Sequence, residues 1–263
     1  MCLALLALHA LPGTPLLLIG NRDEFHARPS APAAPWAEDA GVAGGRDLQA
    51  GGSWLAVRND GRFALVTNHR AGPVPRAALS RGTLVTEFLL GDGGAARAAQ
   101  TALRHADQYA PFHLLLGDGT EVWRVDCAPR QALRLQPGLH PFGNGPADAL
   151  WPRQQRLLQR FRQTARQRGA GDDDALLALL ADRTQPPDAE LPQTGIGLAR
   201  ERQLAPVFIA GEDYGTRASN VLRMGADGSL CLRERRFGPA GTAAGESLWY
   251  VHAPGAPWRA GPL

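Results

Sequence analysis

The chain begins with MCLALLALHALPGTPLLLIGNRDEF over residues 1–25, and this stretch decides the fold. Its two apolar runs, residues 3–8 and 16–19, are too short for core helices and are separated by Pro-Gly-Thr-Pro, which predicts a β-hairpin. Neither run alternates cleanly with polar residues, so both faces of the hairpin should be covered. The polar sequence NRDE at 21–24 then lies where the second strand returns the chain to the level of Cys2.

Cys2 becomes the first residue if the initiator methionine is removed, and it then carries both a thiol and a free α-amine. An amine with an ordinary pKa of ~7.7–8.0 is a usable base at neutral pH, and a thiol near ~8.5 needs little help to ionise. A nucleophile and its base are thus available within one residue. The alternative is that Cys2 is unreactive and that residues 21–24 form a structural turn with paired charges.

Composition indicates a globular chain of 263 residues, organised as one domain over 1–263, with 44% apolar residues and a net charge of +3. All 28 basic residues are arginine, because the chain contains no lysine. The absence of lysine excludes a Schiff-base lysine and the lysine of a phosphate-binding P-loop. Nucleic-acid binding is not indicated at this charge, and no cofactor is expected.

Three cysteines without a CxxC pair favour a reducing compartment over a disulfide scaffold. The seven histidines show no metal-ligand spacing, so no metal site is expected. The first formal side-chain charge is Arg22, and Pro12 and Pro15 interrupt the apolar start, so neither a signal peptide nor a stable membrane insertion is predicted. We therefore expect a cytoplasmic protein.

Further along the chain, periodicity and turn residues predict strands in hairpins and helices in two groups. Expected strands cover 54–57, 63–68, 112–116, 121–125, 132–135, 139–142, 207–210, 218–223, 230–235 and 247–252, with 132–135 and 139–142 forming one pair. Expected helices cover 82–90, 95–106, 151–168 and 175–181, the last capped by Asp172, Asp173 and Asp174. Residues 24–52 and 186–204 are expected to be long loops. Strands and helices in separate blocks favour a mostly antiparallel α+β layer fold.

The helix expected over 151–168 has an apolar stripe that includes Leu157 and Phe161, while arginines occupy much of its remaining surface. A solvated outer helix packed on a sheet is the favoured interpretation. The alternative is a helix that holds an acidic ligand or lies on an anionic surface.

Several short motifs occur in an order that identifies a family. They are Cys2, Gly20-Asn21-Arg22-Asp23-Glu24-Phe25, Arg28-Pro29, Gly51-Gly52-Ser53-Trp54-Leu55, Thr67-Asn68 and Tyr214-Gly215-Thr216-Arg217. Together they resemble the NRDE family, which includes the transport and Golgi organisation protein 2 type. The N-terminal region resembles, more distantly, the choloylglycine hydrolases and the acyl-CoA:penicillin acyltransferase-like cysteine amidases. Those are N-terminal-nucleophile hydrolases, so the resemblance implies a four-layer αββα sandwich.

The resemblance also implies roles for particular residues. Cys2 would be the nucleophile and its own α-amine the base, with Arg22 and Asp23 holding them in place. Glu24 could fill the acidic position instead, and Asn21 could fill that of the arginine. Asn144, in Gly143-Asn144-Gly145-Pro146, resembles the turn that supplies an oxyanion-hole amide, although a left-handed turn asparagine would look the same. Asn68 is a second polar candidate near the site, and Arg217 would be a substrate-side or structural arginine.

Two classes of function follow. The first is a cofactor-free cysteine amidohydrolase or acyltransferase that acts on an acyl amide or thioester through an acyl-enzyme on Cys2. The second is a non-catalytic protein of the same fold that binds and traffics acyl-CoA, lipid or haem. His69 is a weaker candidate for a general base or haem ligand, whereas Cys127 and Cys231 are expected to be inert strand residues.

Overall fold

The predicted N-terminal hairpin lies at the centre of the structure, a computed structural model that describes residues 2–70 and 77–262, with backbone only at 2 and 168. Strands β1 (Cys2–Leu11) and β2 (Thr14–Phe25) pair antiparallel. Gly13, in the turn between them, has a φ of +66°, which glycine adopts without strain. The register sets Cys2 opposite Arg22, so the NRDE sequence does return the chain to the level of Cys2.

The first sheet contains this hairpin and has the strand order β10-β1-β2-β11-β12-β13-β14, with every neighbouring pair antiparallel. Its other strands are β10 (Gly138–Phe142), β11 (Tyr214–Met224), β12 (Leu230–Phe237), β13 (Ala243–Val251) and β14 (Arg259–Ala260). Because β2 pairs with β1 on one side and β11 on the other, strands from the N-terminal and C-terminal parts of the chain are neighbours in the middle of this sheet.

The second sheet is a meander in which seven consecutive strands pair in sequence order, β3 to β9. The strands are β3 (Ser30–Pro35), β4 (Val42–Asp47), β5 (Leu55–Arg58), β6 (Phe63–Asn68), β7 (Phe112–Gly117), β8 (Val122–Asp126) and β9 (Gln131–Arg134). Neighbouring strands of this sheet are therefore joined by short connections, apart from the helical insertion between β6 and β7.

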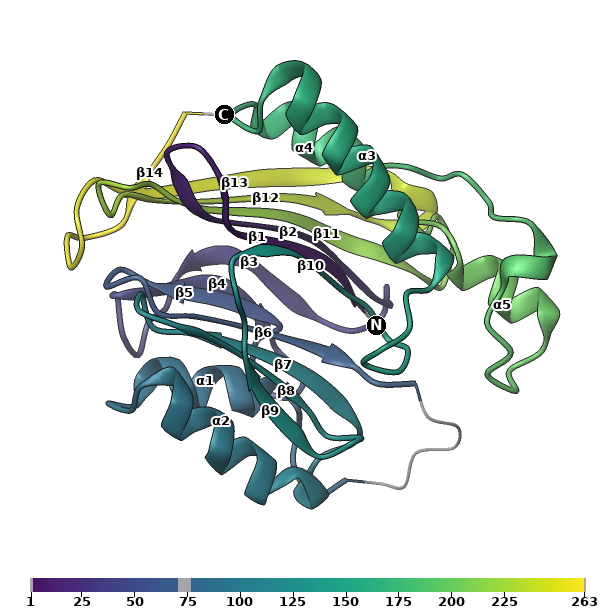
Figure 1. Cartoon of the computed structure of the whole chain (residues 1–263), viewed down its shortest axis with the longest axis horizontal. Helices are drawn as coiled ribbons and strands as arrows, with labels where there is room; N and C mark the ends of the chain where they lie inside the picture. The colour runs from purple at the N-terminus through teal and green to yellow at the C-terminus, as the bar shows by residue number, and fades with distance from the viewer. Residues whose placement is uncertain (1, 71–76, 263) are drawn as a thin grey trace.

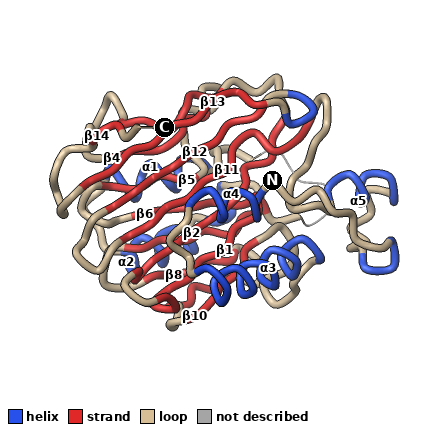
Figure 2. The backbone as a smooth tube through the Cα atoms, turned by 90° about the horizontal axis from the view of Figure 1, so that it is seen from above, coloured by secondary structure: helices blue, strands red, loops and turns tan. Residues whose placement is uncertain are grey.

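Helices cover the outer face of each sheet, which gives the four layers of an αββα sandwich (Figures 1 and 2). Helices α1 (Gly82–Leu90) and α2 (Ala95–Arg104) cover the second sheet, and α3 (Pro152–Arg168) and α4 (Asp173–Leu180) cover the first. The remaining helical segments are α5 (Leu198–Leu204), η1 (Ala106–Gln108), η2 (Asp188–Glu190) and η3 (Pro239–Gly241). The sandwich predicted from the resemblance is confirmed.

The hydrophobic core explains why the first strand does not alternate with polar residues. Ala4 and Leu6 point into the core between the sheets, whereas Leu3 and Leu5 pack against the helical layer. Because a strand of this sheet is buried on both faces, successive residues must all be apolar. A second outer core, between the second sheet and α1 and α2, completes the layers.

The arginine-rich helix α3 is an outer helix packed on the first sheet, as favoured from its apolar stripe. Leu157 and Phe161 are buried against the sheet. Arg156 and Arg160 each bring a guanidinium nitrogen to 2.6 Å from Asp182 Oδ2. Within the described ranges, none of the helices has the length and apolar character needed to cross a bilayer.

Several expectations about local structure are wrong. Residues 186–204 contain the helical segments η2 and α5 rather than one long loop. Residues 24–52 contain β3 and β4 rather than a loop, and the proline-rich β3 is tolerated because it is an edge strand. Residues 207–210 form no strand, because their backbone bonds to side chains and loops, as in the Ile209 N–H donated to Thr216 Oγ1 at 3.0 Å. Strands β9 and β10 do not pair with each other but belong to different sheets.

We expect Leu157→Ala to lower the free energy of unfolding by about 2–5 kcal/mol, because it removes a buried side chain between α3 and the sheet. Urea denaturation measures the change. The matched control is Leu133→Ala on β9, where the side chain is 48% exposed and little should change. Equal losses in the two variants would contradict the packing described for α3.

Candidate active site

The end of β2 brings the NRDE residues between the first strand and the far end of the chain. Cys2 lies opposite Arg22 on one side, and Asp23 lies opposite Thr216 of β11 on the other. The side chain of Cys2 and the whole of Met1 lie outside the described residues. The predicted methionine removal and the nucleophilic role of Cys2 therefore stay predictions, while the backbone position of Cys2 is established.

Asp23 is a fully buried residue held by side chains of two elements, β11 and α3. The Thr216 hydroxyl donates to Oδ1 at 2.7 Å, and Arg153 Nη2 of α3 donates to Oδ2 at 2.7 Å. The Tyr214 hydroxyl donates to the Asp23 backbone carbonyl at 3.1 Å. A buried charge needs such a set of partners to persist in the ionised form. The carboxylate is thus fixed one residue from the strand position opposite Cys2.

Arg22 projects to the other face of the sheet, into the space between the two sheets. Its guanidinium lies 4.2 Å from the ring centroid of Trp54, which is itself buried. This cation–π contact holds the charge against an aromatic face supplied by the segment before β5. Adjacent residues of β2 therefore direct opposite charges to opposite faces, because strand side chains alternate.

A cavity of about 100 Å³ lies beside these residues, at the end of β2. Its lining includes Arg22, Asp23, Glu24, Arg28, Asp47, Ser53, Trp54, Asn68 and Arg81. Three arginines and three acidic residues thus meet around one small space. The predicted residues Arg22, Asp23, Glu24 and Asn68 are brought together here.

The charges at the mouth of this cavity are tied to one another. Arg28 Nη2 lies 2.6 Å from Asp47 Oδ2, and Arg28 Nε lies 4.0 Å from Glu24 Oε2. Burial by itself would raise the pKa of Asp47, but the Arg28 guanidinium and two backbone N–H groups hold that pKa below its ordinary value. Asp47 therefore stays ionised and keeps Arg28 in place.

Asn144 lies in the turn after β10, at the same end of the sandwich. Its Nδ2 donates to the Asn68 carbonyl at 2.7 Å, and the Arg70 N–H donates to the Asn144 carbonyl at 2.7 Å. The β1–β10 register ends at the pair of Ala4 and Phe142, and Asn144 follows two residues after Phe142. The predicted oxyanion-hole residue therefore contacts the cavity-lining Asn68.

Two predicted substrate-binding residues have other partners. Asn21 Nδ2 donates to the carbonyls of Leu180 and Val207 at 2.9 Å each, and its Oδ1 accepts from the Ser219 hydroxyl at 2.7 Å. Arg217 Nη1 donates to carbonyls in the turn after β2, such as that of Phe25 at 2.9 Å. Their geometry does not support substrate binding, because Asn21 faces the helical layer and Arg217 clamps a turn.

The two cysteines beyond Cys2 have poorly ionised thiols. Burial raises the pKa of Cys127, which follows β8 instead of lying in a strand as expected. Burial and the nearby charge of Asp173 raise the pKa of Cys231 on β12 to about 11. Both thiols should react slowly with electrophiles near neutral pH, since the thiolate is the nucleophile.

Sequence reasoning missed Arg153 and Trp54. Arg153 was one of many arginines on α3, but it lies four residues before Leu157 and hence on the buried face of the helix. That spacing could have identified it as a buried charge in need of an acidic partner. Trp54 stands in the ordered motif at 51–55, but nothing local indicates its contact with Arg22, which lies on the other sheet.

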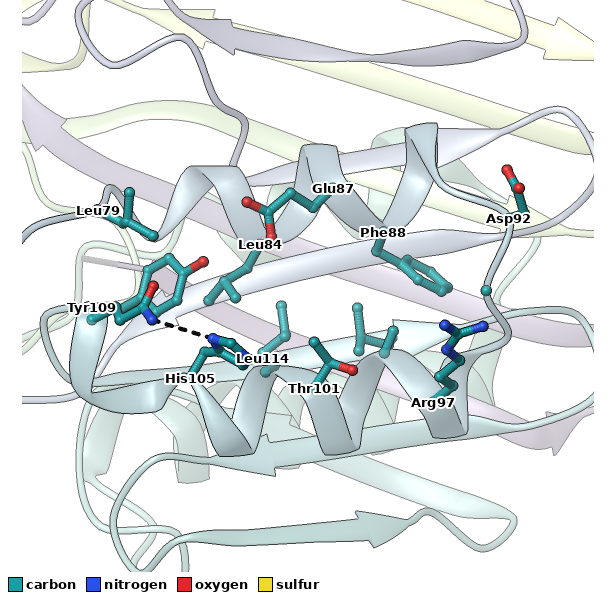
Figure 3. Close-up of a pocket in the computed structure, with 15 residues that line it drawn as sticks. Leu79, Leu84, Glu87, Phe88, Asp92, Arg97, Thr101, His105, Tyr109 and Leu114 are labelled. Carbon is teal, nitrogen blue, oxygen red and sulfur yellow. Dashed lines mark hydrogen bonds between the residues drawn. The ribbon is translucent and has the colours of Figure 1, made fainter.

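A larger cavity, of about 490 Å³, lies on the outer face of the second sheet between α1 and α2 (Figure 3). Glu87 and Tyr109 face it from opposite sides, Leu114 contributes to its floor, and Gln108 Nε2 lies 3.2 Å from His105 Nδ1 at one end. Among the described residues that line it, none is a predicted site residue, so it is separate from the candidate active site.

The αββα sandwich is similar in fold to solved hydrolase structures. The C2A mutant of the conjugated bile acid hydrolase from Clostridium perfringens matches it with a TM-score of 0.54 and 9% identity, covering 100% of this chain and 97% of that chain. The Caenorhabditis elegans N-acylethanolamine-hydrolyzing acid amidase ortholog has a TM-score of 0.49 and 11% identity, covering 84% and 92%. At this identity the likeness concerns the fold.

Within this fold class, the chain belongs to the Transport and Golgi organisation 2 family, whose family model matches residues 1–239. The Transport and Golgi organization protein 2 homolog of Bos taurus is 29% identical over 236 residues, covering 84% of this chain and 86% of the relative. The Homo sapiens homolog is 28% identical with the same coverage, and the Drosophila melanogaster protein is 27% identical over 243 residues, covering 83% and 84%. The family indicated by the ordered motifs is confirmed.

We expect Arg153→Leu to lower the free energy of unfolding by about 3–5 kcal/mol, because the buried Asp23 carboxylate loses this guanidinium. Combining it with Asp23→Asn should cost less than the sum of the two single changes, as a double-mutant cycle in urea would measure. Arg166→Leu, at an exposed position of the same helix, is the control. Strict additivity would show that the pair is not coupled.

Glu234 of β12 is a buried carboxylate on the inner face of the first sheet. Its Oε1 accepts from the Ala33 N–H at 2.8 Å and lies 3.4 Å from Arg236 Nη1, whereas its buried Oε2 has no hydrogen-bond partner within the described part of the chain. Burial raises the pKa of Glu234, against the opposing effects of the Ala33 N–H and Arg236. The folded protein thus holds this proton more tightly than the unfolded chain does.

We expect the free energy of unfolding of Glu234→Gln to increase relative to that of the parent protein as the pH rises above the ordinary glutamate pKa of 4.5. Above that pH the unfolded chain releases the Glu234 proton first, so the parent protein loses stability while the glutamine variant, which keeps an acceptor for Ala33, does not. Urea denaturation across acidic to neutral pH tests this, with the exposed Glu190→Gln as control. A stability difference that does not change with pH would refute it.

Proposed function

We propose that the chain is an N-terminal-cysteine amidohydrolase or acyltransferase that acts on an acyl amide or thioester through an acyl-enzyme on Cys2. The observation that carries the proposal is the strand register. It sets the backbone of Cys2 opposite Arg22 and one residue from the buried Asp23, and the last pair of the β1–β10 register, Ala4 and Phe142, lies two residues before the Asn144 turn. The proposed nucleophile, acidic partner and amide donor thus come from three segments that reach the same end of the sandwich.

In the proposed reaction the Cys2 sulfur attacks the substrate carbonyl carbon while the α-amine of Cys2 takes the thiol proton. The carbonyl oxygen becomes an oxyanion and accepts a hydrogen bond from the second N–H of Asn144 Nδ2, whose first N–H is donated to Asn68. The ammonium then gives its proton to the leaving nitrogen or sulfur as the bond to carbon breaks. Water or an acceptor amine attacks the acyl-cysteine, returns a proton to the thiolate and releases the product.

The acidic role is assigned to Asp23 in preference to Glu24. Asp23 is fully buried and bound to Thr216 and Arg153, whereas Glu24 is partly exposed and accepts from the neighbouring Phe25 N–H at 2.8 Å. A carboxylate near an α-amine orients the amine but also raises its pKa, which would weaken it as a base. The Arg153 guanidinium, 2.7 Å from Asp23 Oδ2, offsets the charge of the carboxylate and so limits the rise in the pKa of the amine.

The small charged cavity supports a substrate with a polar or charged group close to its scissile bond. Arg22, Arg28 and Arg81 line this space beside Asp23, Glu24 and Asp47. Guanidinium groups bind carboxylate, phosphate and carbonyl oxygens through well-directed N–H donors. An acyl substrate that presents such oxygens would be oriented by the arginines while its carbonyl carbon meets the cysteine.

We expect intact-mass spectrometry to show that Met1 is lost and that iodoacetamide alkylates Cys2 in preference to Cys127 and Cys231. When the protein is mixed with a panel of N-acyl compounds and acyl-CoA thioesters, at least one compound should form a transient acyl adduct. The preference follows because the raised pKa values of Cys127 and Cys231 leave few thiolates near neutral pH. Cys2→Ala should abolish the adduct, and the matched control Cys231→Ala should retain it.

Full turnover by Cys2→Ala would overturn the mechanism. If no panel member forms an adduct but acyl-CoA or haem binds the intact protein at micromolar levels, the non-catalytic binding function replaces the enzymatic one.

A further inference from the structure

The turn that carries Asn144 is held by the second sheet, although it belongs to the first. Four of its carbonyls contact donors from β6, β7 and β8 or the residues next to them. The Thr67 hydroxyl donates to the Gly143 carbonyl at 2.9 Å, and the Arg70 N–H donates to the Asn144 carbonyl at 2.7 Å. Arg124 Nη2 donates to the Ala147 carbonyl at 3.1 Å. His113 Nε2 lies 2.9 Å from the Gly145 carbonyl oxygen. The turn is therefore fixed across the gap between the sheets.

His113 is the central member of this set and is itself held by a buried carboxylate. Its Nδ1 lies 2.5 Å from Asp126 Oδ1, and Asp126 also accepts from Arg124 Nε at 2.8 Å and Gln131 Nε2 at 3.0 Å. Burial would raise the pKa of Asp126, but the bond to His113 and the charge of Arg124 hold it below the ordinary value. The carboxylate is ionised, so it accepts a hydrogen bond from His113 Nδ1 and fixes the orientation of the ring.

His69 completes the chain of contacts. Its Nδ1 lies 3.0 Å from His113 Nε2, with the two rings edge to face at a centroid distance of 4.9 Å. Burial and the neighbouring His113 lower the pKa of His69, so its ring is neutral near physiological pH. Because the N–H at His113 Nδ1 is donated to Asp126, Nε2 of a neutral His113 ring accepts, and the hydrogen bond to the Gly145 carbonyl comes from His69. Both imidazoles are buried and directed at the turn rather than at the cavity.

We propose that His113, oriented by Asp126, is a positioning residue that fixes the Asn144–Gly145 turn so that the Asn144 amide is aimed at the reacting carbonyl. This inference rests on the proposed function. An oxyanion donor contributes only when it is held in place before the reaction, and a displacement of about 1 Å can cost about 10²-fold in rate. Gly145 lets this turn pack closely against Trp151, because a Cβ at position 145 would lie 2.5 Å from the Trp151 ring.

Two substitutions of His113 separate the contacts of its two ring nitrogens. His113→Gln places an amide group near the position of Nε2 and can still contact His69 and the Gly145 carbonyl, whereas His113→Asn places it near Nδ1 and can reach only Asp126. We expect His113→Asn to lower the single-turnover rate of acyl-adduct formation by about 10²-fold, and His113→Gln to remain within a few-fold of the parent. Alkylation of Cys2 by iodoacetamide should be unchanged in both. His105→Asn, at the exposed position that follows α2, is the control.

A second readout does not depend on catalysis. In protein labelled at asparagine side chains, the Asn144 amide should be protected from hydrogen exchange, because it is buried and donates to Asn68. Its resonance is assigned by its loss in Asn144→Ser. Protection should persist in His113→Gln and be lost in His113→Asn. Should His113→Asn fail to fold, Asp126→Asn, which has the same size, is expected to shift the same resonance and slow the same step.

The outcomes are distinguishable. If the parent protein forms no acyl adduct, the proposed function fails, and the exchange measurement alone decides whether His113 positions the turn. If His113→Asn and His113→Gln lose equal stability while both keep the Asn144 protection and the rate of adduct formation, His113 is a packing residue and the positioning role is refuted.

Discussion

The pairing of β1 with β2 is the constraint on which the rest of the structure depends. Both strands are buried on both faces. After a shift by one residue most apolar side chains would still face an apolar layer, so apolar packing alone does not specify the register. The polar end of β2 supplies the specification. A slip by one residue would turn Asp23 away from Arg153 and place a carboxylate in the core between the sheets. The register that satisfies this charge is the one that sets Cys2 opposite Arg22.

Much of the fold could be predicted from the sequence, because its signals are local. The Pro-Gly turn between two apolar runs, the Asp-Gly hairpins and the apolar stripe of α3 each identify an element without reference to the rest of the chain. The edge strand β3 could not be recognised in this way, because its alanines and prolines resemble a loop. Strands β9 and β10 were correctly located but wrongly paired, since strand periodicity carries no information about the sheet to which a strand belongs.

The candidate site was predictable only where its residues are close in sequence. Residues 21–24 stand together at the end of one strand, and the Gly-Asn-Gly turn draws attention to Asn144. The partners that give these residues their environment are distant, as Arg153 is 130 positions from Asp23 and His113 is 32 from Gly145. Long-range pairs of this kind depend on how the two sheets are stacked, which no local pattern encodes. Asn21 and Arg217 bond to the backbone of other segments, and for Arg217 this is the structural alternative of its prediction.

The outermost strands of the two sheets have a consequence for self-association. Exposed edges with unpaired backbone groups recruit strands from other copies, which is the route to amyloid-like stacking. In the described structure, β3 contains Pro32 and Pro35, β10 contains Pro141, β14 has only two residues and β9 only four. Proline withholds a backbone donor, and so short a strand offers almost no template. A sandwich whose central strands are this rich in leucine is thereby protected from aggregation at its margins.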